Sequence, residues 1–463
     1  MNSRNLTNQL AYRWLMAALI VSLSTACTAP RAIFAQELTS SMLLRPHIES
    51  LNAQHDDVSK AIEIFKTGDF IQAKQLLGSV CEADTSLPPS ELLLATMFQA
   101  AGRPNLARVE LENAMQSRPN DPGALLIFAE SAIQNGRYAE AKILFERAAQ
   151  LTTQLSNNAY RKQNIQNRIA LNSAAIAEYR NSWSEAADLL EPLAVQEPGN
   201  SKVISRLSRS LFKSGKSDEA LVILKKHWNE NKTTTQRPEI TMAVLYQEAN
   251  DLRKAEELMV AASELEAENA VNQTTVARWA LDNGKLELAK KCVDRALNTQ
   301  PNPETRLLSA LVARYQKDYE AAQAILESAH LESPANLGII LELAMTLSNI
   351  KGEENRGLQY AQLAVKIQPD LRQPAGRNAA MSLAWLLYRF GGQAESEKIL
   401  QTVLMAGPMS AECNYFAARI LMNKNRSASK QLFEEIIKSG RQFPGFNEAK
   451  DLYEKTIWSQ ERP

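Results

Sequence analysis

The amino-acid sequence predicts an all-α fold, an α-solenoid of about eleven helix-turn-helix units that is closed by a C-terminal capping helix. Three observations predict it. Turn residues recur with a period near 34 residues, small and bulky side chains occupy fixed positions around each turn, and a proline closes many of the units. No segment alternates polar and apolar residues as a half-buried strand does, so we expect no sheet.

The first 35 residues have the order of a secretory signal peptide. Arg13 precedes the apolar run of residues 14–26, and polar sequence follows. This run is too short to span a bilayer comfortably. Two cleavage positions compete, one before Cys27, which would then carry a lipid, and one after Ala35. We therefore expect an exported protein, either periplasmic or anchored in the outer membrane as a lipoprotein.

Residues 36–55 follow the signal peptide and lack the repeated positions, so we expect a polar lead-in or a partial capping helix. The period begins after them. Its turn residues are Gly68, Gly102, Gly136, Asn181, Gly215, Asn250, Gly284, Lys317, Gly352, Gly391 and Lys424. The interval between Gly136 and Asn181 is longer than the others, which predicts a polar insert near residues 152–164.

Small and bulky positions around each turn give the period its physical meaning. Five residues after the turn stand small side chains, from Ala73 and Ala107 to Ser396 and Ser429, and alanine again dominates the position seven residues before it. Small side chains on facing helices allow close approach of the two axes. Large side chains stand nine residues after the turn, and prolines close six units. These prolines are Pro119, Pro198, Pro301, Pro334, Pro369 and Pro408.

This combination of small, bulky and terminal proline positions resembles the tetratricopeptide repeat. The resemblance implies a right-handed superhelix, which we place at residues 56–441. Residues 442–463 would form the capping helix and a tail, because the segment 447–458 is amphipathic. A generic amphipathic helical bundle would explain the helices, but it would not explain the fixed period.

Composition and motifs argue against catalysis and against several ligand classes. Lys and Arg together number 52, as do Asp and Glu, so the summed charge gives nucleic acid no bulk attraction. The four cysteines form no CxxC pair, and the four histidines show no metal-ligand spacing. Three of the cysteines are interpreted as small helix-packing residues. The sequence carries no G-x-G-x-x-G, GxxxxGKS or G-x-S-x-G motif. We therefore expect no enzyme, no cofactor and no metal.

By the resemblance, side chains of the first helix of each unit line the concave surface, which is the candidate binding surface. Basic and aromatic residues dominate this lining in the central and C-terminal units, and such residues are enriched at protein interfaces. The candidate partner-binding residues are Lys202, Arg209, Lys213, Arg278, Arg314, Tyr315, Trp385, Tyr388 and Arg389. An isolated solvated helix face is the alternative interpretation of each. The set favours a protein or peptide partner with acidic groups.

The family's known clamp for a terminal carboxylate is not visible, because Ile62, Leu92 and Leu126 stand where polar donors are required. The expected fold and the expected signal peptide together resemble those of exported scaffolds of the cell envelope. We therefore expect a non-enzymatic scaffold or adaptor that binds a partner in the concave groove. The alternative is an accessory protein of exopolysaccharide or protein secretion machinery, in which Tyr315, Trp385 and Tyr388 touch sugar. A third hypothesis is a hydrolase built on a solenoid. Membrane contact is expected only through a lipid on Cys27, and the oligomeric state stays open.

Overall fold

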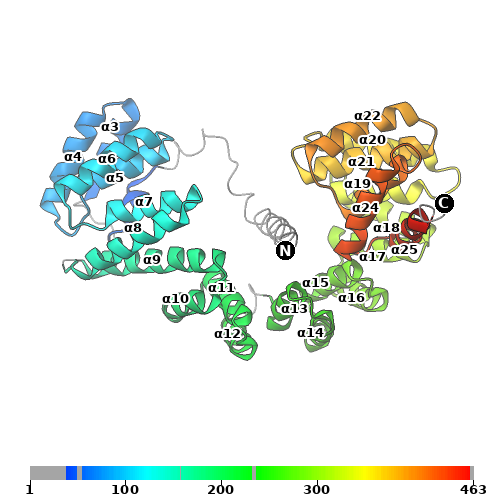
Figure 1. Cartoon of the computed structure of the whole chain (residues 1–463), viewed down its shortest axis with the longest axis horizontal. Coiled ribbons are helices and arrows are strands. Elements are labelled where there is room, and N and C mark those ends of the chain that lie inside the picture. The colour runs from blue at the N-terminus through cyan, green and yellow to red at the C-terminus, as the bar shows by residue number, and fades with distance from the viewer. Residues whose placement is uncertain (1–37, 50–54, 157, 232–235, 459–463) are drawn as a thin grey trace. The chain divides into compact units, whose positions relative to one another are not determined.

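The computed structural model describes residues 38–49, 55–156, 158–231 and 236–458. The predicted signal peptide and Cys27 lie outside these residues. Within them the chain forms 24 α-helices, α2 to α25 (Figure 1). The chain divides into two compact units, residues 1–227 and 228–463, each of which is described by itself.

The helices form consecutive antiparallel pairs, which confirms the predicted fold. Unit 1 begins with the short helix α2 (Ser40–Leu44), and unit 2 ends with α25 (Phe446–Trp458). The pairs between them number eleven, as the sequence predicts. They are α3 (Asp56–Thr67) with α4 (Phe70–Ala83), α5 (Ser90–Ala100) with α6 (Pro104–Ser117), α7 (Gly123–Gln134) with α8 (Tyr138–Thr153), α9 (Ala159–Tyr179) with α10 (Trp183–Gln196), α11 (Ser201–Lys213) with α12 (Ser217–Glu230), α13 (Pro238–Glu248) with α14 (Leu252–Leu265), α15 (Ala270–Asp282) with α16 (Leu286–Thr299), α17 (Pro303–Tyr315) with α18 (Tyr319–Glu332), α19 (Leu337–Leu347) with α20 (Glu354–Ile367), α21 (Pro374–Arg389) with α22 (Gln393–Ala406), and α23 (Ala411–Leu421) with α24 (Arg426–Ser439).

The turn residues end the first helix of each pair in the left-handed conformation. Ten of the eleven predicted positions have positive φ, and Lys424 is the exception among them. Glycine adopts this conformation without steric cost, which explains its dominance at the position. Asn181, Asn250 and Lys317 adopt it as well, with φ of 59°, 63° and 61°. Asparagine tolerates this region, whereas lysine is strained there.

The small positions are where the two helices of a pair meet. Ala73, Ala141 and Ala289 are 0% exposed. In the ninth pair the position is Gly357, because a methyl group there would lie 2.9 Å from the Ala344 carbonyl oxygen of α19. The serines of the last two pairs keep their hydroxyls paired across the hairpin. Ser396 Oγ donates to the Ala384 carbonyl at 2.7 Å, so a polar atom is buried here without an unmet hydrogen bond.

The predicted insert mostly lengthens helices. α8 has 16 residues and α9 has 21, so the extra chain near residues 152–164 is absorbed by the end of α8 and the start of α9. Asn158 caps α9, since its side chain accepts a hydrogen bond from the Arg161 backbone N–H at 2.7 Å. The insert is therefore structured helix on either side of a short connection.

The described part of the lead-in, residues 38–49, contributes apolar side chains to the core. Leu43 and Leu44 are 1% and 0% exposed, and they join a cluster with residues of α3 and α5. We call residues 38–49 the lead-in segment. The sequence left open a polar lead-in or a partial capping helix, and the short helix α2 with its buried leucines favours the second for these residues.

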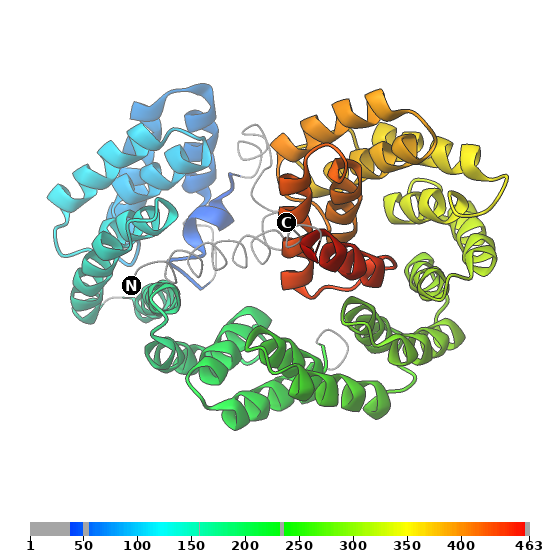
Figure 2. The same ribbon diagram turned by 45° about the vertical axis from the view of Figure 1, so that its right-hand side comes forward.

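The last pair of unit 2 folds back onto earlier pairs of the same unit. Figure 2 shows α23 to α25, in dark orange and red, inside the arc of the preceding helices of this unit. Beyond α24, the Gln442 backbone N–H donates to the Asp282 carbonyl at 2.9 Å, and Arg441 pairs with the Asp282 carboxylate at 2.9 Å. The capping helix α25 packs against α24, and its Ala449 is fully buried.

Candidate functional site

We call the surface formed by the first helices of the pairs the inner face of each unit. In unit 1, α11 places the predicted basic residues on it. α11 buries Val203 and Leu207 and is capped by the Asn200 side chain. Lys202 is exposed, and Arg209 and Lys213 are half-buried, each with part of its side chain accessible. Spacings of seven and four residues put the three cations on one side of the helix.

Ion pairs join successive first helices of unit 1 and involve arginines that sequence reasoning missed. Arg168 of α9 makes two contacts with Glu130 of α7, at 2.7 and 3.0 Å. Arg206 of α11 holds Glu178 of α9 in the same bidentate way, at 2.9 and 3.1 Å. Each of these pairs joins neighbouring first helices, and a comparison of repeated positions along the sequence does not show which residues of two helices meet. This part of the inner face is therefore neutral.

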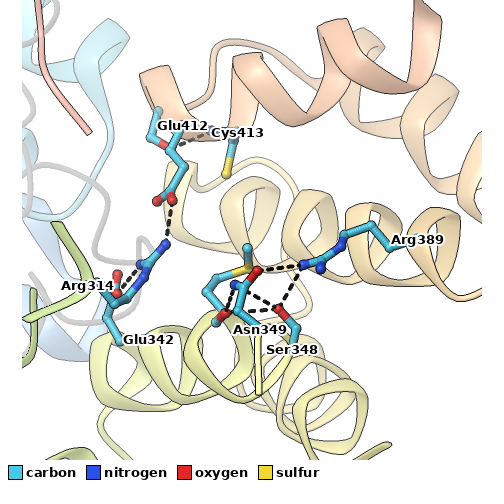
Figure 3. A network of polar contacts seen from close by, with 9 residues as sticks. Arg314, Glu342, Ser348, Asn349, Arg389, Glu412 and Cys413 are labelled. Carbon is cyan, nitrogen blue, oxygen red and sulfur yellow. Dashed lines mark hydrogen bonds and ion pairs between the residues drawn. The ribbon is translucent and has the colours of Figure 1, made fainter. Parts of the chain in front are cut away.

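In unit 2, the predicted cations have different environments. Arg278 of α15 is exposed and pairs with the exposed Glu304. Arg314 of α17 is only 4% exposed, and it bridges Glu342 of α19 and Glu412 of α23 (Figure 3). Burial alone would lower its pKa, but the two carboxylates outweigh burial and raise it, so Arg314 stays charged. Burial also raises the pKa of Glu342, against the attraction of Arg314.

Of the predicted partner-binding candidates, Arg314 is buried and Tyr315 is half-buried. The Arg314 guanidinium is enclosed by the carboxylates of two other pairs, and Glu412 is 98 residues away in sequence. Tyr315 donates its hydroxyl to the Leu281 carbonyl at 3.3 Å, and burial raises its pKa. Arg314 thus joins α23 to α17 and α19, whereas the half-buried Tyr315 joins α17 to α15.

The remaining candidates gather in an aromatic cluster on α21, which α23 completes. Trp385 stacks on Phe416 at a centroid distance of 5.2 Å and lies 6.0 Å from Tyr388. Arg389 lies over the Trp385 ring at 5.9 Å, and Arg419 of α23 lies over it at 5.4 Å. These distances suit cation–π attraction. Trp385 itself is 7% exposed, so the arginines and Tyr388 form the outer part of the cluster.

Arg389 keeps capacity for a further contact. It is exposed, and its Nη1 donates to Ser348 Oγ at 3.2 Å and to Asn349 Oδ1 at 3.3 Å (Figure 3). Both acceptors are neutral, so no carboxylate neutralises its charge in these contacts. Arg419, by contrast, pairs with Glu448 of α25. Arg419 is not among the predicted candidates, and its place on the first helix of the last pair was the signal that could have found it.

The cysteines behave as packing residues. Burial raises the pKa of the Cys81 thiol to about 12, of Cys292 to about 11 and of Cys413 to about 12. Such thiols carry no thiolate near neutral pH. Among the described residues, no three His, Cys, Asp or Glu side chains gather as metal ligands. No helix in the described ranges combines the length and apolar character needed to cross a membrane.

One family model and two curated proteins are similar to parts of this chain. The profile of the family described as tetratricopeptide repeat matches residues 98–161. Cellulose synthase operon protein C of Pseudomonas fluorescens (strain SBW25) is 25% identical over 228 residues, which are 46% of this chain and 17% of that protein. The protein of the same name from Escherichia coli (strain K12) is 26% identical over 191 residues, 39% of this chain and 16% of that protein. The chain thus spans less than a fifth of the length of these curated relatives.

Among solved structures, the yeast Tom70 matches with a TM-score of 0.39 and 16% identity, over 88% of this chain and 96% of that chain. The chain is all-α with its helices in consecutive antiparallel pairs, matches the tetratricopeptide-repeat family over residues 98–161, and is distantly similar to bacterial cellulose synthase operon protein C.

Proposed function

We propose that this protein is a non-enzymatic scaffold of the cell envelope that binds a protein or peptide partner on the inner faces of its repeats. The observation that carries the proposal is the set of cations on first helices that remain accessible, Lys202, Arg209, Lys213, Arg278 and Arg389. Arginine donates in fork geometry to carboxylates, so an acidic partner segment suits this surface. Tetratricopeptide repeats form scaffolds that are generally non-catalytic.

The envelope location rests on two supports. Residues 1–35 have the order of a signal peptide, and the distant relatives are named for a cellulose synthase operon. Mass spectrometry of the mature protein tests the location. We expect the amino terminus at a lipid-modified Cys27 or at Gln36, whereas an intact Met1 recovered from the cytoplasm contradicts it.

Affinity capture from an envelope extract tests the partner surface. The charge-reversed variant Lys202→Glu, Arg209→Glu, Lys213→Glu is compared with the parent chain. Lys225→Glu, Lys226→Glu on the second helix α12 is the matched control, because both lysines are exposed. We expect the inner variant to lose partners that the control retains, and to bind the remaining ones with lower salt tolerance. Equal capture by all three chains contradicts an inner-face partner site.

A second candidate function follows from the relatives' printed name and from the cluster around Trp385. Stacked aromatic side chains suit sugar rings, so this surface could serve an accessory protein of exopolysaccharide or protein secretion. The ring of Tyr388, which lies 6.0 Å from the buried Trp385 and belongs to the outer part of the cluster, is the contact that this function needs. A change in tryptophan fluorescence on adding cello-oligosaccharide, lost in Tyr388→Ala, supports it; an unchanged spectrum rejects it.

A further inference from the structure

The lead-in segment lies against the inner face of unit 1. Its Met42, Leu43, Pro46 and His47 form one wall of a cavity of about 230 Å³. The opposite wall comes from the first helices of three successive pairs, α5, α7 and α9. It includes Leu92, Thr96, Leu126, Glu130, Ile165 and Arg168. A segment of the chain thus occupies the surface on which a partner would be expected.

The repeats hold the lead-in segment partly through its backbone. Asn158 Nδ2 donates to the His47 carbonyl at 2.7 Å and to the Ser86 carbonyl at 3.0 Å. The same side chain caps α9 through its oxygen, so its orientation is fixed by the repeat fold. A contact to a backbone carbonyl does not depend on the side chain of the bound residue. Asn158 can therefore hold a different segment in the same place.

The fit of the lead-in segment is incomplete. His47 Nδ1, Arg161 Nε and Asn164 Oδ1 are buried and have no hydrogen-bond partner among the described residues. All three residues line the same cavity, and His47 and Arg161 are 8% and 3% exposed. Buried polar atoms without partners are unfavourable. The Arg161 nitrogen needs an acceptor and the Asn164 oxygen needs a donor, and an imidazole at position 47 pairs with neither.

The surrounding charges decide which side chain would fit better. Arg161 already makes two contacts of 2.7 Å with Asp121, and Arg168 is paired with Glu130. A carboxylate at position 47 would therefore add a buried charge beside cations that already have carboxylate partners. A side-chain amide is neutral and offers both an acceptor oxygen and a donor nitrogen. A neutral imidazole also has one donor and one acceptor, but the His47 ring leaves its own Nδ1, Arg161 Nε and Asn164 Oδ1 without partners, so we infer that Asn or Gln suits this position better than His, Asp or Glu.

We propose that the inner face of α5, α7 and α9 is a binding groove that the lead-in segment occupies in cis and that a partner segment occupies in trans. The partner segment carries two adjacent leucine-sized side chains followed three residues later by Asn or Gln. This inference rests on the proposed function, and it adds that the lead-in segment must leave before the partner binds. Leu43 and Leu44 are the anchors that set the strength of this competition.

Fluorescence anisotropy tests the competition with a defined probe. The probe is a labelled synthetic peptide of residues 38–49, and the receptor is the full chain carrying Leu43→Asp and Leu44→Asp, which releases its own segment. We expect the probe to bind this variant at least tenfold more tightly than the parent, in which the segment competes. Adding Asn158→Ala should weaken binding about tenfold, the effect of roughly 1.4 kcal/mol. No binding to the folded variant, or equal binding to both chains, overturns the proposal.

A second comparison tests the amide and covers a variant that fails to fold. A probe with Gln in place of His47 should bind about tenfold more tightly, and equal affinity rejects the amide preference. In the intact chain, His47→Gln should slow amide hydrogen exchange of residues 43–48, whereas unchanged or faster exchange overturns the inference. If the probe fails to bind while charge reversal on α11 still abolishes capture, the cis occupant is wrong and the scaffold function stands.

Discussion

Removal of the Arg314 guanidinium should destabilise unit 2 far more than removal of an exposed arginine on the same inner face. Arg314 is 4% exposed and holds Glu342 and Glu412, which belong to α19 and α23. In Arg314→Met two carboxylates lose their buried counter-charge. Breaking a buried pair in this way costs about 3 to 5 kcal/mol. The effect should be local to the contact that closes the last pair onto α17.

The matched control is Arg278→Met. Arg278 also sits on a first helix and also pairs with a glutamate, but the side chains of the pair are 57% and 53% exposed. Exposed pairs contribute about 0 to 1 kcal/mol. Native-state hydrogen exchange gives the readout, because each 1.36 kcal/mol changes the exchange of a locally opening segment about tenfold.

We expect amides of α17, α19 and α23 to exchange roughly 10² to 10⁴ times faster in Arg314→Met, which follows from the 3 to 5 kcal/mol above. In Arg278→Met the change should be about tenfold or less. Similar exchange rates in the two variants would refute the assignment of Arg314 to the fold-back. Such a result would return Arg314 to the set of partner-binding candidates.

Two further predictions concern the turns and the lead-in segment. Lys317→Gly should stabilise unit 2 by about 0.5 to 1 kcal/mol, because lysine at φ 61° is strained and glycine is not. This figure allows for the extra conformational entropy that glycine loses on folding. Urea unfolding measures the gain and should show none for Lys317→Ala. The pKa of His47 lies well below 6.5 because of burial and then of Arg161 and Arg168. Because the buried histidine resists protonation, the released segment takes up a proton first as the pH falls below 6.5. The docked state therefore keeps its full stability above pH 6.5 and loses stability below it, so docking of the lead-in segment should weaken below pH 6.5. His47→Gln should remove this pH dependence, as measured by hydrogen exchange of residues 43–48.

The repeat could be predicted from the sequence because its determinants are local and recur. A left-handed turn favours glycine or asparagine, and a close helix crossing requires alanine, glycine or serine, so each pair leaves the same marks. The eleven pairs follow from these recurring residues, and ten of the eleven predicted turn positions are left-handed. Lys424 departs from the pattern, and α23 ends three residues before it.

The candidate site was harder to predict because its contacts join distant parts of the chain. Arg314 lies on a first helix as Arg278 does, yet only the fold-back of α23 brings Glu412 beside it, across 98 residues. The lead-in segment has no repeated column, so nothing in the pattern indicated that Leu43 and Leu44 would be buried. Positions on first helices predict which side chains face inward. They do not predict which of these side chains another part of the chain covers.

Site-specific photo-cross-linking in living cells tests the central claim most directly. A photoreactive residue is placed on the inner faces at Lys202 or Tyr388, and on second helices at Ile143 or Met405, which are 67% and 82% exposed. A scaffold that binds through its inner faces predicts a discrete cross-linked partner from an inner position and none from the two outer ones. The account would be contradicted if a partner were captured from Ile143 or Met405 and none were captured from Lys202 or Tyr388.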